Sequence, residues 1–344
     1  MTTSIIRLVE QGMPWTGLDP FIFTVHHVDD YPAGSADLGP AVSLDGRNIG
    51  SDFSYIDGWS MYHGDRVPGF PQHPHRGFET VTVVRKGYVD HSDSLGATAR
   101  YGGGDTQWLT TGSGIMHAEM FPLLNEDAGN PLELFQIWLN LPPDTKMVPA
   151  HFSILWSEDI PTVAGGPGVS VDVIAGAIDG VAAPSPPPDS WASQPGSDMA
   201  IWLIRLDEAA SWSIPVAPAG VHRVLHFFDG DSVSIDGTEI QPTHGAQLDP
   251  TKATQLTNTG GPAEMLLLHG RPIGAPVFQM GPFVMNTPEE LQQAFADYRR
   301  TQFGGWPWPS RSHVHPGSEG RFALHADGLT ERRDMQPTSS TRHN

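Results

Sequence analysis

Two short segments of the 344-residue chain place metal-binding side chains two positions apart. His73 and His75 form the first pair, and His117 and Glu119 form the second. Side chains two positions apart in a β-strand point to the same face of a sheet. Two such strands facing one barrel interior would bring three imidazoles and one carboxylate around a single point. This donor set contains no sulfur and suits a first-row transition metal that keeps open positions for a substrate.

The residues between the two pairs predict short antiparallel strands. Residues 79–84 read Glu-Thr-Val-Thr-Val-Val, a run rich in β-branched residues that Gly87 ends. Residues 88–94 and 106–110 read as two further strands, with a turn at 102–105 between them. Strands and turns at this spacing predict an antiparallel barrel or sandwich rather than βαβ units.

The same stretch resembles the pirin family. The resemblance is carried by His-Pro-His-Arg-Gly-Phe-Glu-Thr-Val-Thr from residue 73, Gly-Asp-Thr-Gln-Trp from residue 104 and His-Ala-Glu-Met from residue 117. Pirins are bicupins, so the resemblance implies an all-β fold: two cupin (double-stranded β-helix, jelly-roll) barrels in tandem, with a C-terminal helix. It also implies a metal set, which is His73, His75, His117 and Glu119. Glu79 stands where many cupins have a ligand, and in a pirin it belongs to the strand instead.

Composition excludes several classes of function. The net charge of −20 argues against a broad phosphate-binding surface, so we expect no direct binding of nucleic acid. Without cysteine, a metal must be held by His, Asp or Glu. We find no signal peptide and no apolar run near the roughly 18 residues that a membrane span needs. We therefore expect a cytoplasmic monomer that does not bind a membrane.

Length and strand pattern predict two domains and a tail. We expect an N-terminal metal-binding cupin over residues 1–150 and a C-terminal cupin over residues 165–305. The histidines of the second domain are scattered, so we expect it to hold no metal. They are His222, His226, His244 and His269. Residues 306–344 are rich in Pro, Ser and Arg and are expected to be a disordered tail.

One helix is expected over residues 288–303. Thr287 and Glu290 have the spacing of a capping box, and Pro288 occupies the first helical position. The proline-rich residues 181–196 predict an extended, poorly ordered surface insertion.

A second His-x-His pattern occurs in the tail, at His313 and His315, with Glu319 four residues further on. No β-branched strand and no His-x-Glu pair follow it, so we interpret it as a chance match. In the apolar stretch 132–140, Gln136 is the odd residue. It either pairs with the backbone of a neighbouring strand or lines a substrate cavity, because a buried amide needs a partner in both cases.

The resemblance implies two functions of different classes. The first is a metal-dependent dioxygenase of the quercetin 2,3-dioxygenase type, acting with O2 on a flavonol-like aromatic substrate. Fe(II) is the expected metal, with Mn, Co, Ni, Cu and Zn as alternatives, and Glu119 would be both ligand and catalytic base. Phe78, Trp108 and Trp138 are either core residues or the side chains that flank the substrate. The second function is a non-catalytic, redox-sensing pirin that regulates a protein partner such as a transcription factor.

Overall fold

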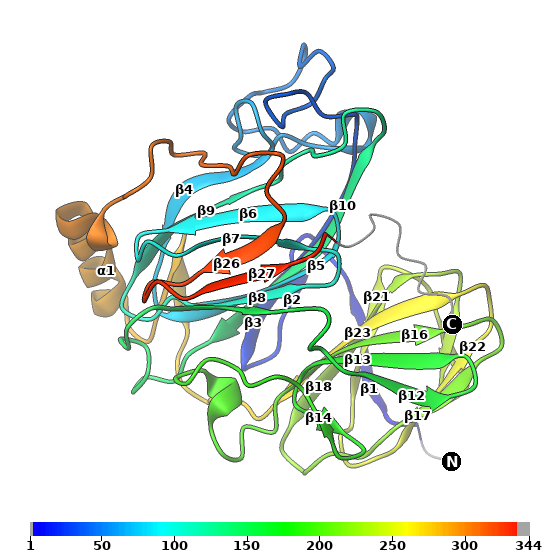
Figure 1. The fold of residues 1–344 in the computed structure, drawn as a ribbon. Helices are drawn as coiled ribbons and strands as arrows, with labels where there is room; N and C mark the ends of the chain where they lie inside the picture. Colours follow the sequence, from blue (N-terminus) through cyan, green and yellow to red (C-terminus); the bar gives the residue numbers. More distant parts are fainter. Residues whose placement is uncertain (1–2, 336–344) are drawn as a thin grey trace. The chain divides into compact units, whose positions relative to one another are not determined.

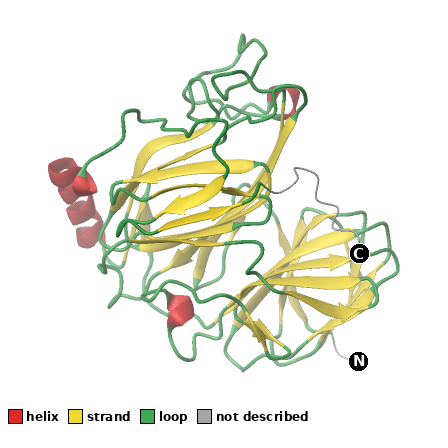
Figure 2. Ribbon diagram, viewed as in Figure 1, coloured by secondary structure: helices red, strands yellow, loops and turns green. Residues whose placement is uncertain are grey.

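The computed structural model of the protein describes residues 3–335, and β-strands form most of its regular secondary structure (Figures 1 and 2). The chain divides into two compact units that are interleaved in sequence. The first unit contains the residues up to Val25, Ile137–Pro142 and Glu158–Ala275. The second contains His26–Gln136, Pro143–Ser157 and the residues from Pro276 onward. These units differ from the linear domain boundaries expected from the sequence, because each barrel includes strands from distant parts of the chain.

The first unit is built on a seven-stranded antiparallel sheet with the order β1-β21-β18-β23-β16-β13-β12 and a four-stranded sheet with the order β17-β22-β19-β20. The strands of the two sheets are β1 (Ile5–Glu10), β12 (Thr162–Gly166), β13 (Val169–Ala175), β16 (Ala200–Leu206), β17 (Ser211–Ile214), β18 (His222–Asp229), β19 (Val233–Ile235), β20 (Thr238–Ile240), β21 (His244–Leu248), β22 (Thr254–Asn258) and β23 (Ala263–Gly270).

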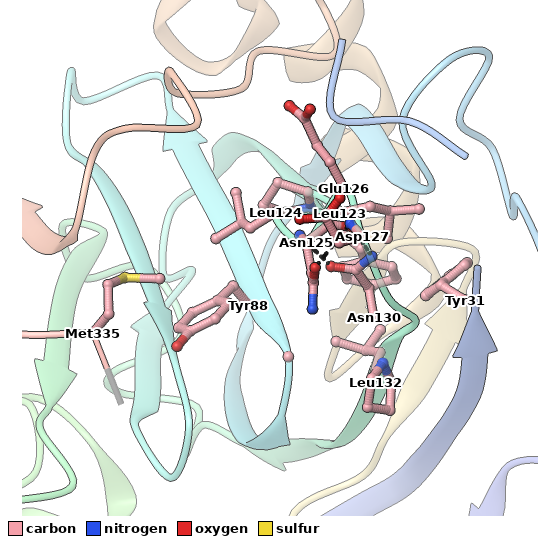
Figure 3. Close-up of a pocket in the computed structure, with 14 residues that line it drawn as sticks. Tyr31, Tyr88, Leu123, Leu124, Asn125, Glu126, Asp127, Asn130, Leu132 and Met335 are labelled. Carbon is pink, nitrogen blue, oxygen red and sulfur yellow. Dashed lines mark hydrogen bonds between the residues drawn. The ribbon is translucent and has the colours of Figure 1, made fainter. Parts of the chain in front are cut away.

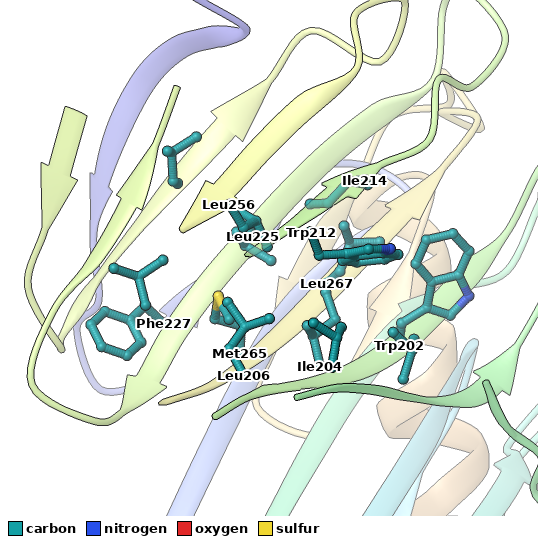
Figure 4. Close-up of a cluster of buried hydrophobic side chains, with 14 of the residues drawn as sticks. Trp202, Ile204, Leu206, Trp212, Ile214, Leu225, Phe227, Leu256, Met265 and Leu267 are labelled. Carbon is teal, nitrogen blue, oxygen red and sulfur yellow. The ribbon is translucent and has the colours of Figure 1, made fainter. Parts of the chain in front are cut away.

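Strict alternation along these strands makes the core of the first unit. In β16 every second residue, including Trp202, Ile204 and Leu206, belongs to one buried apolar cluster, as the period of a strand requires. Figure 4 shows Trp202, Ile204, Trp212 and Leu267 packed in this cluster. Within the described residues, no group of three metal-capable side chains lies in this unit.

The second unit contains both donor pairs. One sheet has the order β11-β8-β5-β10-β3, and the other has the order β27-β26-β7-β6-β9-β4, whose strands Figure 1 shows side by side. The strands are β3 (Phe21–Tyr31), β4 (Gly69–His75), β5 (Phe78–Lys86), β6 (Tyr88–Asp93), β7 (Thr98–Gly102), β8 (Thr106–Thr110), β9 (Ile115–Met120), β10 (Asn130–Asn140), β11 (His151–Leu155), β26 (Arg321–Leu324) and β27 (Thr330–Arg333). All of these pairings are antiparallel where a register is defined, which agrees with the barrel expected from the sequence.

The α-helix of the described chain, α1 (Pro288–Thr301), begins as the sequence predicts. Thr287 Oγ1 accepts the N–H of Glu290, and the Glu290 carboxylate accepts the N–H of Thr287, which completes the capping box. The helix ends at Gln302, which takes a left-handed conformation with φ of 48° and opens one 3₁₀ turn. No helix in residues 3–335 is long and apolar enough to cross a membrane.

The expectation of a disordered tail is wrong for the described residues after 305. Strand β26 pairs with β7, and β27 pairs with β26. Arg321 anchors this hairpin through a fully buried ion pair with Asp105, at 2.7 Å. The composition suggested disorder because a sequence does not distinguish a buried arginine from a solvated one. Residues 336–344 of the predicted tail lie outside the described chain.

A second buried ion pair holds the segment before the hairpin. Arg100 is fully buried and donates two hydrogen bonds to Asp90, at 2.7 and 2.8 Å. The same guanidinium donates to the backbone carbonyls of His315, Pro316 and Glu319. We call residues 306–335 the C-terminal arm. The backbone carbonyls of the C-terminal arm thus accept hydrogen bonds from the buried guanidinium of Arg100.

The proline-rich insertion is also more ordered than expected. Ser190 caps a short 3₁₀ turn (Trp191–Ser193) by accepting the N–H of Ala192 at 3.1 Å. Trp191 Nε1 donates to the carbonyl of Arg271 at 2.9 Å. This hydrogen bond of the Trp191 indole therefore holds residues 181–196 against Arg271, although their prolines alone would favour an extended chain.

Candidate metal centre

The pairing of β4 with β9 brings the two donor pairs together. His73 lies directly opposite His117, and His75 lies opposite Ile115, with an irregularity in the register between Phe70 and His73. Ring nitrogens of His73, His75 and His117 all lie within 4.8 Å of one another. Among the described residues, these three histidines are the one group of three side chains close enough together to hold a metal ion. The histidines that their i, i+2 spacing in the sequence indicated therefore do lie close together in the structure.

The separation of two of these nitrogens matches a coordination shell. His73 Nε2 and His117 Nε2 are 2.9 Å apart. Imidazole nitrogens bind first-row metals at about 2.0–2.1 Å, so two of them at a right angle around one ion would stand about 2.9 Å apart. This separation is therefore compatible with adjacent positions around a single ion.

Backbone carbonyls fix the tautomers of two of the histidines. His73 Nδ1 lies 3.0 Å from the carbonyl oxygen of Pro71, and His75 Nδ1 lies 3.3 Å from that of Pro282. A carbonyl oxygen only accepts hydrogen bonds, so each Nδ1 carries the proton and each Nε2 keeps its lone pair. An outer hydrogen bond of this kind is the usual support of a metal-ligating histidine.

Burial keeps the three imidazoles neutral. Desolvation lowers the pKa of His73 from 6.5 to about 4. Desolvation, with repulsion from the neighbouring histidines, holds the pKa of His75 and of His117 well below the usual value. Neutral imidazole is the form that binds a metal, so the site needs no proton release from histidine at neutral pH.

Glu119 supplies a buried carboxylate beside the histidines. Its Oε2 lies 3.8 Å from His117 Nε2, and the side chain is almost fully buried. Gln136 Nε2 donates to Glu119 Oε2 at 2.8 Å, and Thr82 Oγ1 donates to Glu119 Oε1 at 3.4 Å. Burial raises the pKa of Glu119 despite these two donors. Gln136 is partly exposed, and its amide orients this carboxylate, which is a role that neither of the two expectations for Gln136 named.

Glu79 and Trp108 lie on the other face of the sheet. In the pairing of β5 with β8, Thr82 is opposite Gln107 and Val81 is opposite Trp108. Thr82 faces Glu119, so alternation turns Trp108 away from the barrel interior. Trp108 Nε1 instead donates to Glu79 Oε1 at 3.2 Å. Trp108 is therefore not placed to flank a ligand at the histidines.

Of the other two candidate aromatic residues, Phe78 lies beside the histidines and Trp138 does not. The ring of Phe78 lies 5.1 Å from that of His75, so Phe78 borders the histidine group. Trp138 belongs to the first unit, where its ring packs 4.3 Å from that of Phe23. The histidine pattern in the tail is also separate, because His315 Nε2 is paired with Thr98 Oγ1 at 3.0 Å.

The sequence reasoning missed a further buried pair beside the centre. In the pairing of β6 with β9, His91 is opposite Glu119 and Asp93 is opposite His117. His91 Nε2 and Asp93 Oδ2 are 3.0 Å apart, and both side chains are fully buried. The signal was available, because His91 and Asp93 stand two positions apart on a strand, like the two donor pairs.

A separate cavity lies elsewhere in the second unit. It has a volume of about 710 Å³, and none of the three histidines lines it. Figure 3 shows Tyr88 and Met335 on one side of it and Leu123, Asn130 and Tyr31 on the other. Its walls carry no group that resembles the histidine centre.

The antiparallel barrel carries its His-x-His strand opposite its His-x-Glu strand, which is the arrangement that the resemblance to the pirin bicupins implies. The sequence model of pirin matches residues 40–139, and that of the pirin C-terminal cupin domain matches residues 201–304. Together these matches cover more than half of the chain. The protein belongs to the pirin family.

Similar proteins agree with this assignment. A Pseudomonas aeruginosa protein provisionally named a quercetin 2,3-dioxygenase is 38% identical over 243 residues, which cover 68% of this chain and 80% of that protein. Human pirin is 37% identical over 249 residues, which cover 71% of this chain and 80% of pirin.

A crystal structure extends the agreement to the fold. The quercetin 2,3-dioxygenase of Acinetobacter baumannii superposes with a TM-score of 0.71 at 24% identity, covering 89% of this chain and 99% of that one. This likeness confirms the bicupin fold expected from the sequence.

Proposed function

We propose that the protein is a metal-dependent dioxygenase of the quercetin 2,3-dioxygenase type, with His73, His75, His117 and Glu119 as the ligands of one divalent metal, Fe(II). The observation that carries the proposal is the convergence of three neutral imidazoles next to one buried carboxylate. Three histidines and a carboxylate leave one or two positions of an octahedron open for a substrate oxygen and O2. A purely structural ion would favour a closed tetrahedron instead.

The role of each ligand follows from its surroundings. A divalent metal bound at this centre would acidify the 3-hydroxyl of a flavonol and provide a position for O2. Glu119 takes the hydroxyl proton, because it is the carboxylate that lies beside the histidines, with its Oε2 3.8 Å from His117 Nε2. Gln136 and Thr82 each hold one carboxylate oxygen and so fix its orientation.

Access to the centre is consistent with a substrate. His73 and Gln136 are partly exposed, whereas His75, His117 and Glu119 are buried. A ligand can therefore reach the centre from the side of His73 while the remaining donors stay shielded from water. The relatives with quercetin dioxygenase names support the flavonol as the substrate to test first.

The test is reconstitution of the metal-free protein with Fe(II) under anaerobic conditions, followed by quercetin and then air. Loss of the flavonol absorbance, together with stoichiometric consumption of O2, is the expected result. Parallel samples with Mn, Co, Ni and Cu identify the active metal. Absence of turnover with every metal, in a protein that binds metal stoichiometrically, would contradict the proposal and favour the non-catalytic regulator.

A further inference from the structure

The surface next to His73 carries a row of aromatic rings. We propose that Phe53, His63 and Phe70, which lead to His73, form an aromatic track along which a flat aromatic ligand reaches the metal centre. The inference rests on the proposed function and adds specificity-determining residues to it. These are residues that the sequence reasoning did not single out.

Backbone pairing places the three rings on one face. Asp52 and Tyr62 form an antiparallel bridge, and Tyr62 and Gly69 form a parallel bridge. Phe53, His63 and Phe70 are the residues that directly follow these three bridged positions. The parallel bridge sets His63 level with Phe70, whereas Phe53 lies diagonally across the antiparallel bridge from His63. Phe70 continues along β4 towards His73.

The rings form an unbroken series. The centroids of Phe53 and His63 are 5.2 Å apart, and those of His63 and Phe70 are 5.7 Å apart. The last step, from Phe70 to His73, is 6.3 Å. Each separation lies within the range of about 4.5–7 Å over which aromatic rings interact favourably.

Exposure falls along the same series. Phe53 is 50% exposed and His63 is exposed, whereas Phe70 and His73 are partly buried. The gradient from an open ring to a candidate ligand is the arrangement that an entry path requires.

The segment that carries the outer rings is held firmly. Asp52 accepts the N–H of Met61 at 2.9 Å and a hydrogen bond from Arg47 at 3.0 Å. The Arg47 guanidinium lies 3.3 Å from the ring centre of Trp59. His63 Nδ1 is 2.8 Å from the carbonyl oxygen of Gly50, which fixes the orientation of its ring. The rings are therefore positioned before a ligand arrives, which lowers the entropic cost of binding.

The track selects ligands by shape and by π-stacking. Phe53 and Phe70 carry no charge and no hydrogen-bonding group, whereas His63 donates its Nδ1–H to Gly50 and keeps Nε2 as an acceptor. A planar ligand with extended aromatic surface would gain the most from offset stacking on these rings. A small aliphatic substrate would gain little.

Binding of quercetin to the Zn(II)-loaded protein, without O2, tests the track separately from turnover. Phe53→Ala should weaken binding about tenfold, because one stacking ring is lost. Phe53→Tyr keeps the ring and should bind within about twofold of the unchanged protein. Phe278→Ala is the matched control, because Phe278 is 40% exposed in the same unit and has no place in the series. With Fe(II) and air, Phe53→Ala should raise KM and leave kcat nearly unchanged.

Metal content and thermal unfolding are measured for every variant, so that a folding defect is recognised. Binding and turnover of quercetin that are identical in Phe53→Ala and the unchanged protein would overturn the track and leave the proposed function intact. Failure of the unchanged, metal-loaded protein to bind quercetin would overturn both.

Discussion

His91 lies directly opposite Glu119 in the pairing of β6 with β9, so a fourth imidazole faces the barrel interior beside the candidate metal centre. Its Nε2 is engaged by Asp93, but its Nδ1 is buried without a hydrogen-bond partner in the described structure. The amide nitrogen and oxygen of the buried Gln107 side chain also have no hydrogen-bond partner in the described structure. The interior of this barrel is therefore polar beyond the four proposed ligands.

We expect ordered water at Gln107. A buried polar atom without a partner costs about 1–3 kcal/mol, and two lie on this one side chain. Water in a polar interior removes most of that cost. A high-resolution crystal structure should show water on the amide, and Gln107→Leu should lower the free energy of unfolding by about 1 kcal/mol. A dry interior, with Gln107→Leu more stable than the unchanged protein, would show that the amide is simply unsatisfied.

Replacement of His117 should abolish stoichiometric metal binding. His117→Ala removes the ring whose Nε2 stands 2.9 Å from that of His73, and the remaining donors cannot close the coordination shell. His315→Ala is the control, because His315 is paired with Thr98 outside the group. Elemental analysis of both purified variants provides the measurement. Equal metal loss in the two would mean that the tail histidines also bind.

Gln136→Met should impair turnover more than metal content. The substitution keeps the volume of the side chain but removes the 2.8 Å hydrogen bond that orients Glu119. Loss of a supporting contact of this kind costs about 10- to 100-fold in activity or affinity. Steady-state rates with quercetin, normalised to bound metal, measure the effect. Unchanged rates would show that the carboxylate is oriented without the amide.

The buried pair of Arg100 and Asp90 should be needed for stability. Arg100→Met leaves the Asp90 charge buried without its partner, which should lower the free energy of unfolding by about 3–5 kcal/mol. The double variant Asp90→Leu with Arg100→Met should recover much of that loss. Arg300→Met is the exposed control, because the Arg300 side chain is 71% exposed, and it should change stability by less than about 1 kcal/mol. Denaturant unfolding followed by circular dichroism separates the three outcomes.

Asp29 should make stability depend on pH. Burial raises the pKa of Asp29 from 3.8 to about 7, although Tyr62 donates to its Oδ2 at 2.7 Å. Between about pH 4 and pH 7 the folded protein therefore binds a proton that the unfolded chain has released, so this group's contribution to stability falls as the pH rises through that window. Asp29→Asn should flatten the profile of unfolding free energy between pH 5 and pH 8. A difference between variant and unchanged protein that does not vary with pH would show that Asp29 keeps an ordinary pKa.

The sequence predicts contacts that depend on local geometry and misses those that depend on register between strands. The shared face of His73 with His75, and of His117 with Glu119, followed from their i, i+2 spacing, since alternation on a strand is fixed locally. The pairing of the two strands was implied by the resemblance to pirins and not by the spacing. The face occupied by Trp108 depends instead on how β5 pairs with β8, which the sequence does not state. The sequence therefore allowed Trp108 as a residue flanking the substrate, and the register between β5 and β8 excludes it.

A long-range ion pair explains why the described residues after 305 are ordered although disorder was expected. Arg321 is fully buried, but an arginine in a segment rich in proline and serine resembles a solvated tail residue. Its partner, Asp105, lies 216 residues earlier, so no local pattern identifies the pair. The capping box at Thr287 and Glu290 was predictable because all of its atoms lie within four residues.

The hydrogen bond between His75 and Pro282 joins residues that are 207 positions apart. During translation, His75 leaves the ribosome long before the carbonyl that orients its ring has been synthesised. A nascent chain that meets a metal ion at that stage offers only an unfinished centre. We therefore expect metal loading to follow completion of the polypeptide, and a chain released early to lack the carbonyl that orients His75.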